Sequence, residues 1–138
     1  MTHITLETSP APDDVSLVLD GLRAFNASRL GEAGRASYAL FLRDESDAIV
    51  GGLTAEVRWQ WLHVDLLWVA ESHRGQGHGS ALLVAAEAEA RRLGCVGAHL
   101  ETGDFQARPF YERHGYTVFG TLEGFPVGSR MYFLRKNL

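Results

Sequence analysis

The chain has 138 residues, of which 46% are hydrophobic and 22% are charged, and its formal net charge is −4. These values are typical of a globular protein and exclude wholesale disorder. The length suits one domain spanning residues 1–138. The lack of a basic excess argues against a general nucleic-acid binder, and the single cysteine excludes an intramolecular disulfide or a cysteine-based zinc cluster.

Apolar runs, the first residues and the single cysteine also indicate where in the cell the protein is expected. No apolar run reaches the roughly 18 residues of a membrane-spanning helix. The first residues, Met1–Thr5, lack the basic and apolar regions of a signal peptide. Because Cys95 also has no partner for a disulfide, we expect a protein of the reducing cytoplasm.

The first half of the chain predicts a short strand, a helix and three further strands. Apolar and polar residues alternate over Ile4–Glu7, as in a strand. Prolines and acids over Ser9–Asp14 are typical of a helix start, and apolar residues at helical spacing extend that helix to Leu30. Three strands joined by turns then predict an antiparallel meander: Tyr38–Arg43, Ala48–Val57 and Trp61–Val69.

The second half of the chain alternates helices and strands. A polar, glycine-rich loop over Glu71–Ser80 leads into a helix over Ala81–Leu93, and a strand follows over Val96–Glu101. The buried face of this helix is predicted to carry Leu83, Ala86, Ala90 and Leu93. The remaining elements are a short helix and two strands: Ala107–Arg113, Tyr116–Leu122 and Arg130–Arg135. Together the elements predict a mixed α+β domain with roughly seven strands.

Two features of the strand Trp61–Val69 bear on a site. Its end, Leu66–Val69, is apolar on both faces, which predicts that both faces are covered. His63 and Asp65 lie two residues apart, and the period of a strand places them on one face with Leu67 and Val69.

The loop Arg74–Ser80, with the sequence R-G-Q-G-H-G-S, is the most informative segment. Its glycines allow the backbone to approach a ligand closely. The helix that follows presents unpaired N–H groups and a positive dipole end, and Arg74 adds a guanidinium suited to phosphate. The segment therefore predicts a phosphate or pyrophosphate site, the alternative being a glycine-rich connector without a ligand.

Two nucleotide-binding motifs can be compared with this loop directly. A P-loop ends in Gly-Lys-Ser/Thr, whereas His78-Gly79-Ser80 contains no lysine. A dinucleotide motif, G-x-G-x-x-G, requires glycine where Ser80 stands, although Glu101 lies at a suitable distance for a ribose carboxylate. A single strand–helix–strand unit behind an antiparallel meander also disfavours a dinucleotide fold.

Two motifs together resemble the GNAT superfamily of N-acetyltransferases. Arg74–Gly79 reads R-x-x-G-x-G, like the coenzyme A pyrophosphate loop of that family, and Ala107–Tyr116 reads A-x-x-F-Y-x-x-x-G-Y, like its second motif. The resemblance extends over Ile4–Arg135. It implies the GNAT acyl-CoA N-acyltransferase fold, with a mixed sheet flanked by helices. It also implies acetyl-CoA as donor and an amine as acceptor.

The resemblance also implies which residues contact acetyl-CoA. They come from a strand end, the glycine-rich loop and the segment before the second motif: Leu67, Trp68, Val69, Arg74, Gly75, Gln76, Gly77, His78, Gly79, Ser80, Asp104 and Gln106. Asp104 stands where the family often has asparagine, and a carboxylate cannot donate a hydrogen bond. We therefore expect Gln106 or backbone groups to take over that contact with pantetheine.

Three catalytic candidates follow from the resemblance. Tyr111 matches the tyrosine that protonates or hydrogen-bonds the departing thiolate. The strand before the loop often supplies an acidic base, which makes Asp65 and His63 the candidates for accepting the proton of the amine. The structural alternatives are core packing for Tyr111 and surface pairing for Asp65 and His63. No histidine spacing indicates a metal site, so we expect none.

The resemblance leaves three functions open. The first is transfer of an acetyl group to a primary amine, with antibiotics, amino acids, polyamines and protein amines as acceptor classes. The second is a non-catalytic acyl-CoA sensor with the same fold. The third is an interaction domain without a cofactor. Pairing of two chains through the strand Arg130–Arg135 is also expected if this strand lies at an open edge of the sheet.

Overall fold

The computed structural model describes all of residues 1–138, which divide into two compact units, Met1–Ala33 and Gly34–Leu138. The first unit contains one helix, α1 (Pro12–Leu30), as predicted. Pro12 occupies the first turn, where its missing N–H costs nothing, and Gly31 ends the helix with φ 77°. The backbone N–H of Gly31 donates to the carbonyl of Ala27 at 2.8 Å. No side chain of α1 is buried.

The strand expected at Ile4–Glu7 is absent, so that prediction is wrong. Apolar and polar residues alternate in this segment as in a strand, but the segment pairs with no other strand. Alternation of apolar and polar residues describes one strand alone, whereas a strand forms only where a neighbour takes its backbone N–H and C=O groups.

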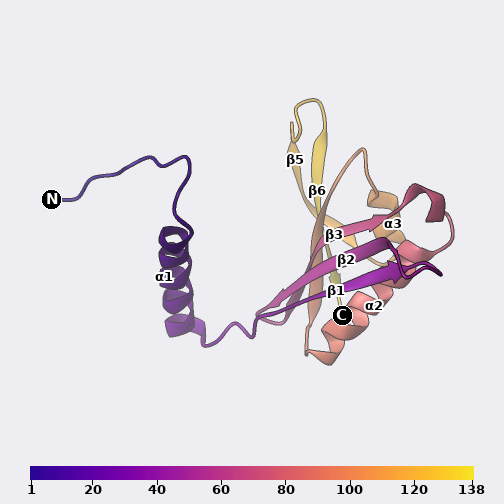
Figure 1. The fold of residues 1–138 in the computed structure, drawn as a ribbon, viewed down its shortest axis with the longest axis horizontal. Coiled ribbons are helices and arrows are strands. Elements are labelled where there is room, and N and C mark those ends of the chain that lie inside the picture. The colour runs from indigo at the N-terminus through magenta and orange to yellow at the C-terminus, as the bar shows by residue number, and fades with distance from the viewer. The chain divides into compact units, whose positions relative to one another are not determined.

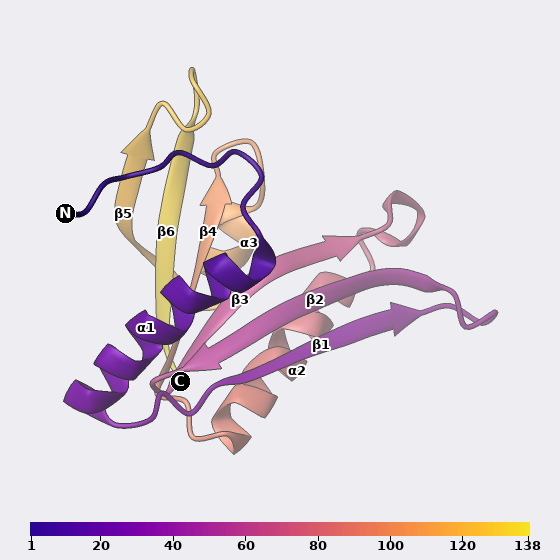
Figure 2. The same cartoon turned by 60° about the vertical axis from the view of Figure 1, so that its left-hand side comes forward.

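The second unit is a six-stranded mixed sheet with the strand order β1–β2–β3–β4–β6–β5 (Figures 1 and 2). All neighbouring strands are antiparallel except β3 and β4, which are parallel. The predicted fold class is confirmed, with six strands. The elements in chain order are β1 (Ala36–Arg43), β2 (Ile49–Arg58), β3 (Trp61–Val69), a short 3₁₀ turn η1 (Glu71–His73), α2 (His78–Arg92), β4 (Gly97–Gly103), α3 (Arg108–Arg113), β5 (Thr117–Glu123) and β6 (Arg130–Asn137).

Two turns set the register of the meander β1–β2–β3. In the first, the Asp44 carboxylate accepts the backbone N–H groups of Ser46 and Ala48 at 2.8 and 3.0 Å. In the second, Trp59 and Gln60 have φ of 47° and 62°, the positive values of a two-residue hairpin turn whose twist matches the strands. The three strands therefore form where alternation and turn chemistry predict them.

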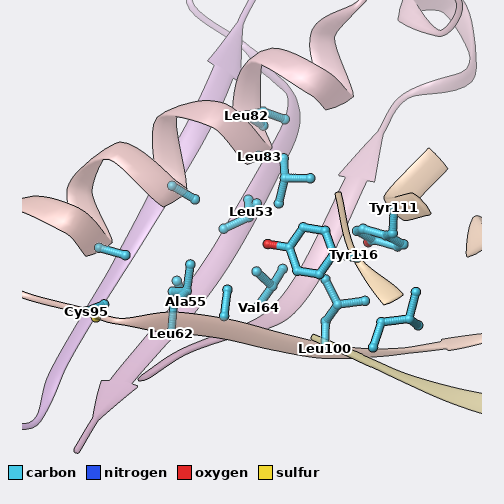
Figure 3. Close-up of a cluster of buried hydrophobic side chains, with 14 of the residues drawn as sticks. Leu53, Ala55, Leu62, Val64, Leu82, Leu83, Cys95, Leu100, Tyr111 and Tyr116 are labelled. Atoms are coloured by element: carbon cyan, nitrogen blue, oxygen red, sulfur yellow. The ribbon is translucent and has the colours of Figure 1, made fainter. Parts of the chain in front are cut away.

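The core lies between the sheet and α2. Figure 3 shows Leu83 of α2 near Leu53 and Val64 of the sheet, with Tyr111 and Tyr116 at one end of the cluster. Leu83, Ala86 and Ala90 of the predicted helix face are fully buried. Leu93, in contrast, is 37% exposed because it follows the last helical residue as the C-cap. Burial of this continuous apolar surface provides most of the driving force for folding of the unit.

One carboxylate is buried inside this core. Glu87 of α2 is 3% exposed, and its two oxygens accept hydrogen bonds from Tyr116 Oη at 2.8 Å and Lys136 Nζ at 2.7 Å. Both oxygens are therefore paired, which offsets the cost of removing the charge from water. The contact ties α2 to β6 and to the residue that precedes β5.

The edges of the sheet are β1 and β5, not the last strand. β6 pairs with β4 on one side and with β5 on the other. Pairing of two chains through the final strand is therefore excluded, because no backbone edge of β6 is free over the paired register. Separately, neither α1 nor any other helix is both long and apolar enough to cross a membrane.

Candidate active site

The central feature of the site is a separation of two parallel strands. β3 and β4 pair only over three residue pairs, from Trp61 with Gly97 to His63 with His99. Beyond that point the two strands diverge, which Figure 2 shows at their arrowheads. A cleft of about 870 Å³ occupies the opening. It is lined by Asp65–Val69, His73–Gly75, Gly77–Ser80, Glu101, Thr102, Gln106, Ala107, Phe110, Tyr111 and Arg113.

A bulge in β3 accompanies this separation. Val64 pairs with Ala55 of β2 and Leu66 pairs with Thr54, so Asp65 is the extra residue. A bulge increases the local twist and bends the strand. β3 therefore turns away from β4 immediately after His63, and the edge of Leu66–Val69 that faces the cleft has no partner strand.

The bulge also corrects two predictions about β3. Leu67 and Val69 pack against the core with Leu62 and Val64, because the inserted residue shifts the alternation by one position. They therefore do not share a face with His63, which lies opposite the core. The prediction that both faces of the strand end are covered is also wrong, since Leu66 is 62% and Trp68 54% exposed.

The glycine-rich loop has the geometry expected for an anion site. Gly75 and Gly77 have φ of 72° and 82°, which L residues rarely adopt, and Gly77 caps α2 without a side-chain hydrogen bond. The unpaired N–H groups of the first turn of α2 therefore lie at the end of the helix that borders the cleft. Arg74 donates from Nε to the carbonyl of Val69 at 2.9 Å, which holds the loop against β3 while its other guanidinium N–H groups stay available. Gln76 is exposed and does not line the cleft.

The opposite wall of the cleft comes from α3. Tyr111 is 8% exposed, and its ring meets the rings of Phe110 and Tyr116 edge-on at 5.1 and 5.9 Å. Burial raises the pKa of Tyr111 above its ordinary value, so the hydroxyl stays protonated and able to donate at neutral pH. Tyr111 therefore lies in the wall of the same cleft as the loop, and its ring also belongs to the core.

In the segment between β4 and α3, Gln106 lies at the cleft and Asp104 does not. Gln106 lines the cleft, and its Oε1 accepts the backbone N–H of Gly103 at 2.6 Å. This bond leaves the amide NH₂ free to donate. Asp104 lies outside the lining, and its backbone N–H donates to the carbonyl of Arg130. The structure therefore places Gln106, and not Asp104, where a pantetheine contact can form.

A second cavity lies where β3 and β4 are still paired, next to the point at which they separate. It measures about 200 Å³ and is lined by Glu56, Arg58, His63, His99 and Glu101. Nε2 of His63 lies 2.8 Å from Oε2 of Glu101, and the rings of His63 and His99 are stacked with centroids 4.7 Å apart. Burial, followed by the nearby His63, lowers the pKa of His99. Glu101 lines both cavities and so connects them.

The comparisons with known proteins decide the family. The profile described as Acetyltransferase (GNAT) family matches residues 4–116. The chain is 44% identical to the blasticidin-S acetyltransferase of Streptomyces morookaense over 119 residues, which are 85% of this chain and 88% of that one. The chain belongs to the GNAT acetyltransferase family.

Solved structures agree with this assignment. A protein described as an acetyltransferase of Agrobacterium tumefaciens superposes with a TM-score of 0.92, at 34% identity, over 99% of this chain and 100% of that one. A second, described as a streptothricin acetyltransferase from Bacillus anthracis, was solved with acetyl coenzyme A. It superposes with a TM-score of 0.67 over 74% of this chain and 62% of that one, at 19% identity, a likeness that concerns the fold.

The GNAT cofactor is acetyl-CoA, and the cleft fits it. The free edge of β3 over Leu66–Val69 can pair with the amide groups of pantetheine, because no strand occupies it. The loop Arg74–Ser80 presents backbone donors and a guanidinium at the other end. These two features lie along one cleft, in the order that the family resemblance implies.

Seven residues of this cleft were not among the site residues expected from the sequence: Leu66, His73, Glu101, Thr102, Ala107, Phe110 and Arg113. Glu101 is the important omission, because it had been considered only as a ribose ligand of a dinucleotide fold. A signal was present: Glu101 lies two residues past His99 on β4, so the period of a strand places both residues on the same face, beside His63. That signal requires the parallel register between β3 and β4.

Proposed function

We propose that this GNAT acetyltransferase transfers the acetyl group of acetyl-CoA directly to the primary amine of a small molecule while both substrates are bound. The observation that carries the proposal is the position of Glu101 in the wall between the cofactor cleft and the smaller cavity. An amine entering from the side of the smaller cavity would meet the thioester at the strand separation. The reaction needs that geometry because the amine must attack the acetyl carbonyl directly.

The acetyl-CoA thioester supplies the acyl group and a thiolate leaving group. The amine must lose a proton, because an alkylammonium ion has no lone pair to attack with. We assign proton acceptance to His63 together with Glu101, since their 2.8 Å contact holds the imidazole and carboxylate at the strand separation. Asp65, exposed at the bulge, lines the cofactor side and would orient the ammonium ion by charge.

Two further groups would stabilise charge as the C–S bond breaks. Backbone N–H groups on the free edge of Leu67–Val69 would hydrogen-bond the carbonyl oxygen as it becomes negative. Tyr111 would donate its hydroxyl proton, or a hydrogen bond, to the departing sulfur. Support for this role comes from its place in the cleft wall and from the burial that keeps the hydroxyl protonated.

The acceptor class proposed is a small cationic amine. Asp65 and Glu101 place two carboxylates around the strand separation, which favours an ammonium ion over an anion. The exposed side chains of Leu66 and Trp68 offer apolar and aromatic surface next to those charges. Blasticidin S is the first compound to test, because a relative 44% identical to this chain bears its name.

A thiol-release assay tests this proposal. Acetyl-CoA is supplied with blasticidin S, a polyamine or an amino acid, and products are identified by mass spectrometry. We expect amine-dependent release of coenzyme A and a product heavier by one acetyl group.

Calorimetry should show saturable binding of acetyl-CoA and none of NAD. The Arg74→Ala variant should bind acetyl-CoA at least about tenfold more weakly, whereas Arg92→Ala, whose guanidinium pairs with Glu89 on the surface, should bind it normally.

The same experiment separates the alternatives. Binding of acetyl-CoA without thiol release for any amine would support the acyl-CoA sensor. Failure to bind any acyl-CoA would contradict the proposal outright.

Residence in the cytoplasm and a homodimeric state also stay predictions. The buried Cys95 thiol suits a reducing compartment. Light scattering on the purified protein will measure the number of chains in the assembly.

A further inference from the structure

Three metal-ligating side chains converge in the smaller cavity. His63 lies on β3, directly opposite His99 of β4 in the parallel register, and Glu101 follows two residues later on the same face. One ligand atom from each of the three lies within 4.8 Å of the others. The cavity they line is open to solvent on a sheet face opposite the core. All three residues come from adjacent strands, so the backbone holds their Cα positions rigidly.

We propose that His63, His99 and Glu101 form a binding site for a divalent transition-metal ion of the zinc class. Two imidazole nitrogens and one carboxylate oxygen are ligands that zinc accepts, and three protein ligands with a fourth open position are common for this ion. Zinc–ligand bonds of about 2.0–2.1 Å place tetrahedral ligand atoms about 3.4 Å apart. The His63–Glu101 separation of 2.8 Å is already near that value. The His99 ligand atom lies within 4.8 Å of the other two and would have to move closer to them to complete the site.

The charges around the cluster permit a cation. Besides the cluster, the cavity is lined by Glu56 and Arg58, so its formal charges, with Glu101, sum to −1. Glu56 also contacts Arg35 at 3.6 Å. Arg135 is the neighbour of His99 on β6, but its guanidinium lies over the ring of Trp61, 5.0 Å from the centroid. Arg35 and Arg135 thus have other partners, and Arg58 is the one positive side chain that lines the cavity.

Metal binding would also affect the proposed transfer reaction. Coordination would engage His63 and Glu101, the pair to which proton acceptance is assigned above, so the ion should inhibit acetyl transfer and a chelator should restore it. The binding itself does not depend on the transfer activity. Direct measurement of binding therefore remains informative even if no amine is acetylated.

The test uses the full chain without an affinity tag. Calorimetric titration with Zn²⁺ should give one ion per chain, and Co²⁺ should give the visible absorption of a nitrogen- and oxygen-ligated site. The variants His99→Gln and Glu101→Gln should each weaken binding by at least about tenfold. The control His3→Gln removes a histidine outside the cluster and should bind the ion normally.

Circular dichroism checks that each variant is folded. Absence of saturable Zn²⁺ binding to the wild-type protein would overturn the proposal. So would binding of equal affinity in wild type and in folded His99→Gln, or binding that is lost only in His3→Gln. If transfer activity is present and insensitive to Zn²⁺ while binding is confirmed, the metal site stands and the assignment of His63 and Glu101 to proton transfer fails.

Discussion

Nε2 of His63 lies 2.8 Å from Oε2 of Glu101, and this contact joins the last paired residue of β3 to a residue of β4 just beyond the paired register. The contact marks the boundary between the cofactor cleft and the smaller cavity, because Glu101 lines both. The proposed reaction places the meeting of the amine and the thioester at this contact.

Replacement of Glu101 by glutamine tests the role of this pair. The amide keeps the shape of the side chain but removes the charge that orients His63 and attracts the amine. We expect kcat to fall by about 10²–10⁴-fold, the usual contribution of a positioned acid or base, while acetyl-CoA binds normally. Thiol-release kinetics and calorimetry provide the two measurements. Glu112→Gln, which loses a surface contact with Arg108, serves as the control and should keep full activity.

Gly77 and Gly21 provide a matched pair of glycine-to-alanine changes. Gly77 has φ 82°, so alanine there should strain the loop by about 1–2 kcal/mol and weaken acetyl-CoA binding by roughly tenfold. Gly21 lies within α1 with open space around its Cα, and alanine there should favour the helix by up to about 1 kcal/mol. Calorimetric affinity that is unchanged in Gly77→Ala would contradict the loop assignment.

The buried carboxylate of Glu87 should make Tyr116 important for stability. Tyr116→Phe removes the hydroxyl that donates to Glu87 at 2.8 Å and leaves one buried carboxylate oxygen without that partner. We expect the free energy of unfolding to fall by about 2 kcal/mol, the usual range for a hydrogen bond to a charged group. Urea denaturation measures this change. A loss below about 0.5 kcal/mol would indicate that water replaces the hydroxyl.

Alkaline pH should destabilise the second unit through buried tyrosines. Burial raises the pKa of Tyr38 to about 12, and its hydroxyl donates to the carbonyl of Ala86 at 2.6 Å. Because the folded-state pKa is the higher one, the stabilisation is fully present below the ordinary tyrosine pKa of about 10 and is lost as pH rises towards 12. Tyr38→Phe should lower stability at neutral pH by about 1 kcal/mol.

The same variant should also show a shallower loss of stability in alkali. Urea denaturation between about pH 8 and about pH 11 would measure the slope. Burial raises the pKa of Tyr111 and Tyr116 as well, so some of the slope should remain in the variant. An identical slope in wild type and Tyr38→Phe would show that Tyr38 does not contribute.

Local patterns in the sequence were sufficient to predict most of the elements. Alternation and turn residues located the meander, and the helical spacing of Leu83, Ala86 and Ala90 located the buried face of α2. These patterns succeed because each depends on neighbours within one turn or one hairpin. Ile4–Glu7 shows their limit, since its alternation is that of a strand but no partner strand is available.

The candidate site was predicted in part for the same reason. The motifs located the loop Arg74–Ser80 and Tyr111, which line one cleft in the structure, because each motif depends on a short stretch of chain. The bulge at Asp65 could not, since nothing in the apolar and polar pattern marks an inserted residue, and the faces of Leu67 and Val69 were assigned wrongly as a result. Glu101 was missed because its position beside His63 depends on the pairing of strands 38 residues apart.

The most direct test of the proposed reaction is acetyl transfer by the Tyr111→Phe variant with an amine that the wild-type protein acetylates. Phenylalanine keeps the ring packing against Phe110 and Tyr116 and removes only the hydroxyl. We predict a fall in kcat of at least about tenfold, with unchanged affinity for acetyl-CoA and a thermal midpoint close to that of wild type. Wild-type turnover in a folded Tyr111→Phe variant would contradict the assignment of the leaving-group step to this cleft wall.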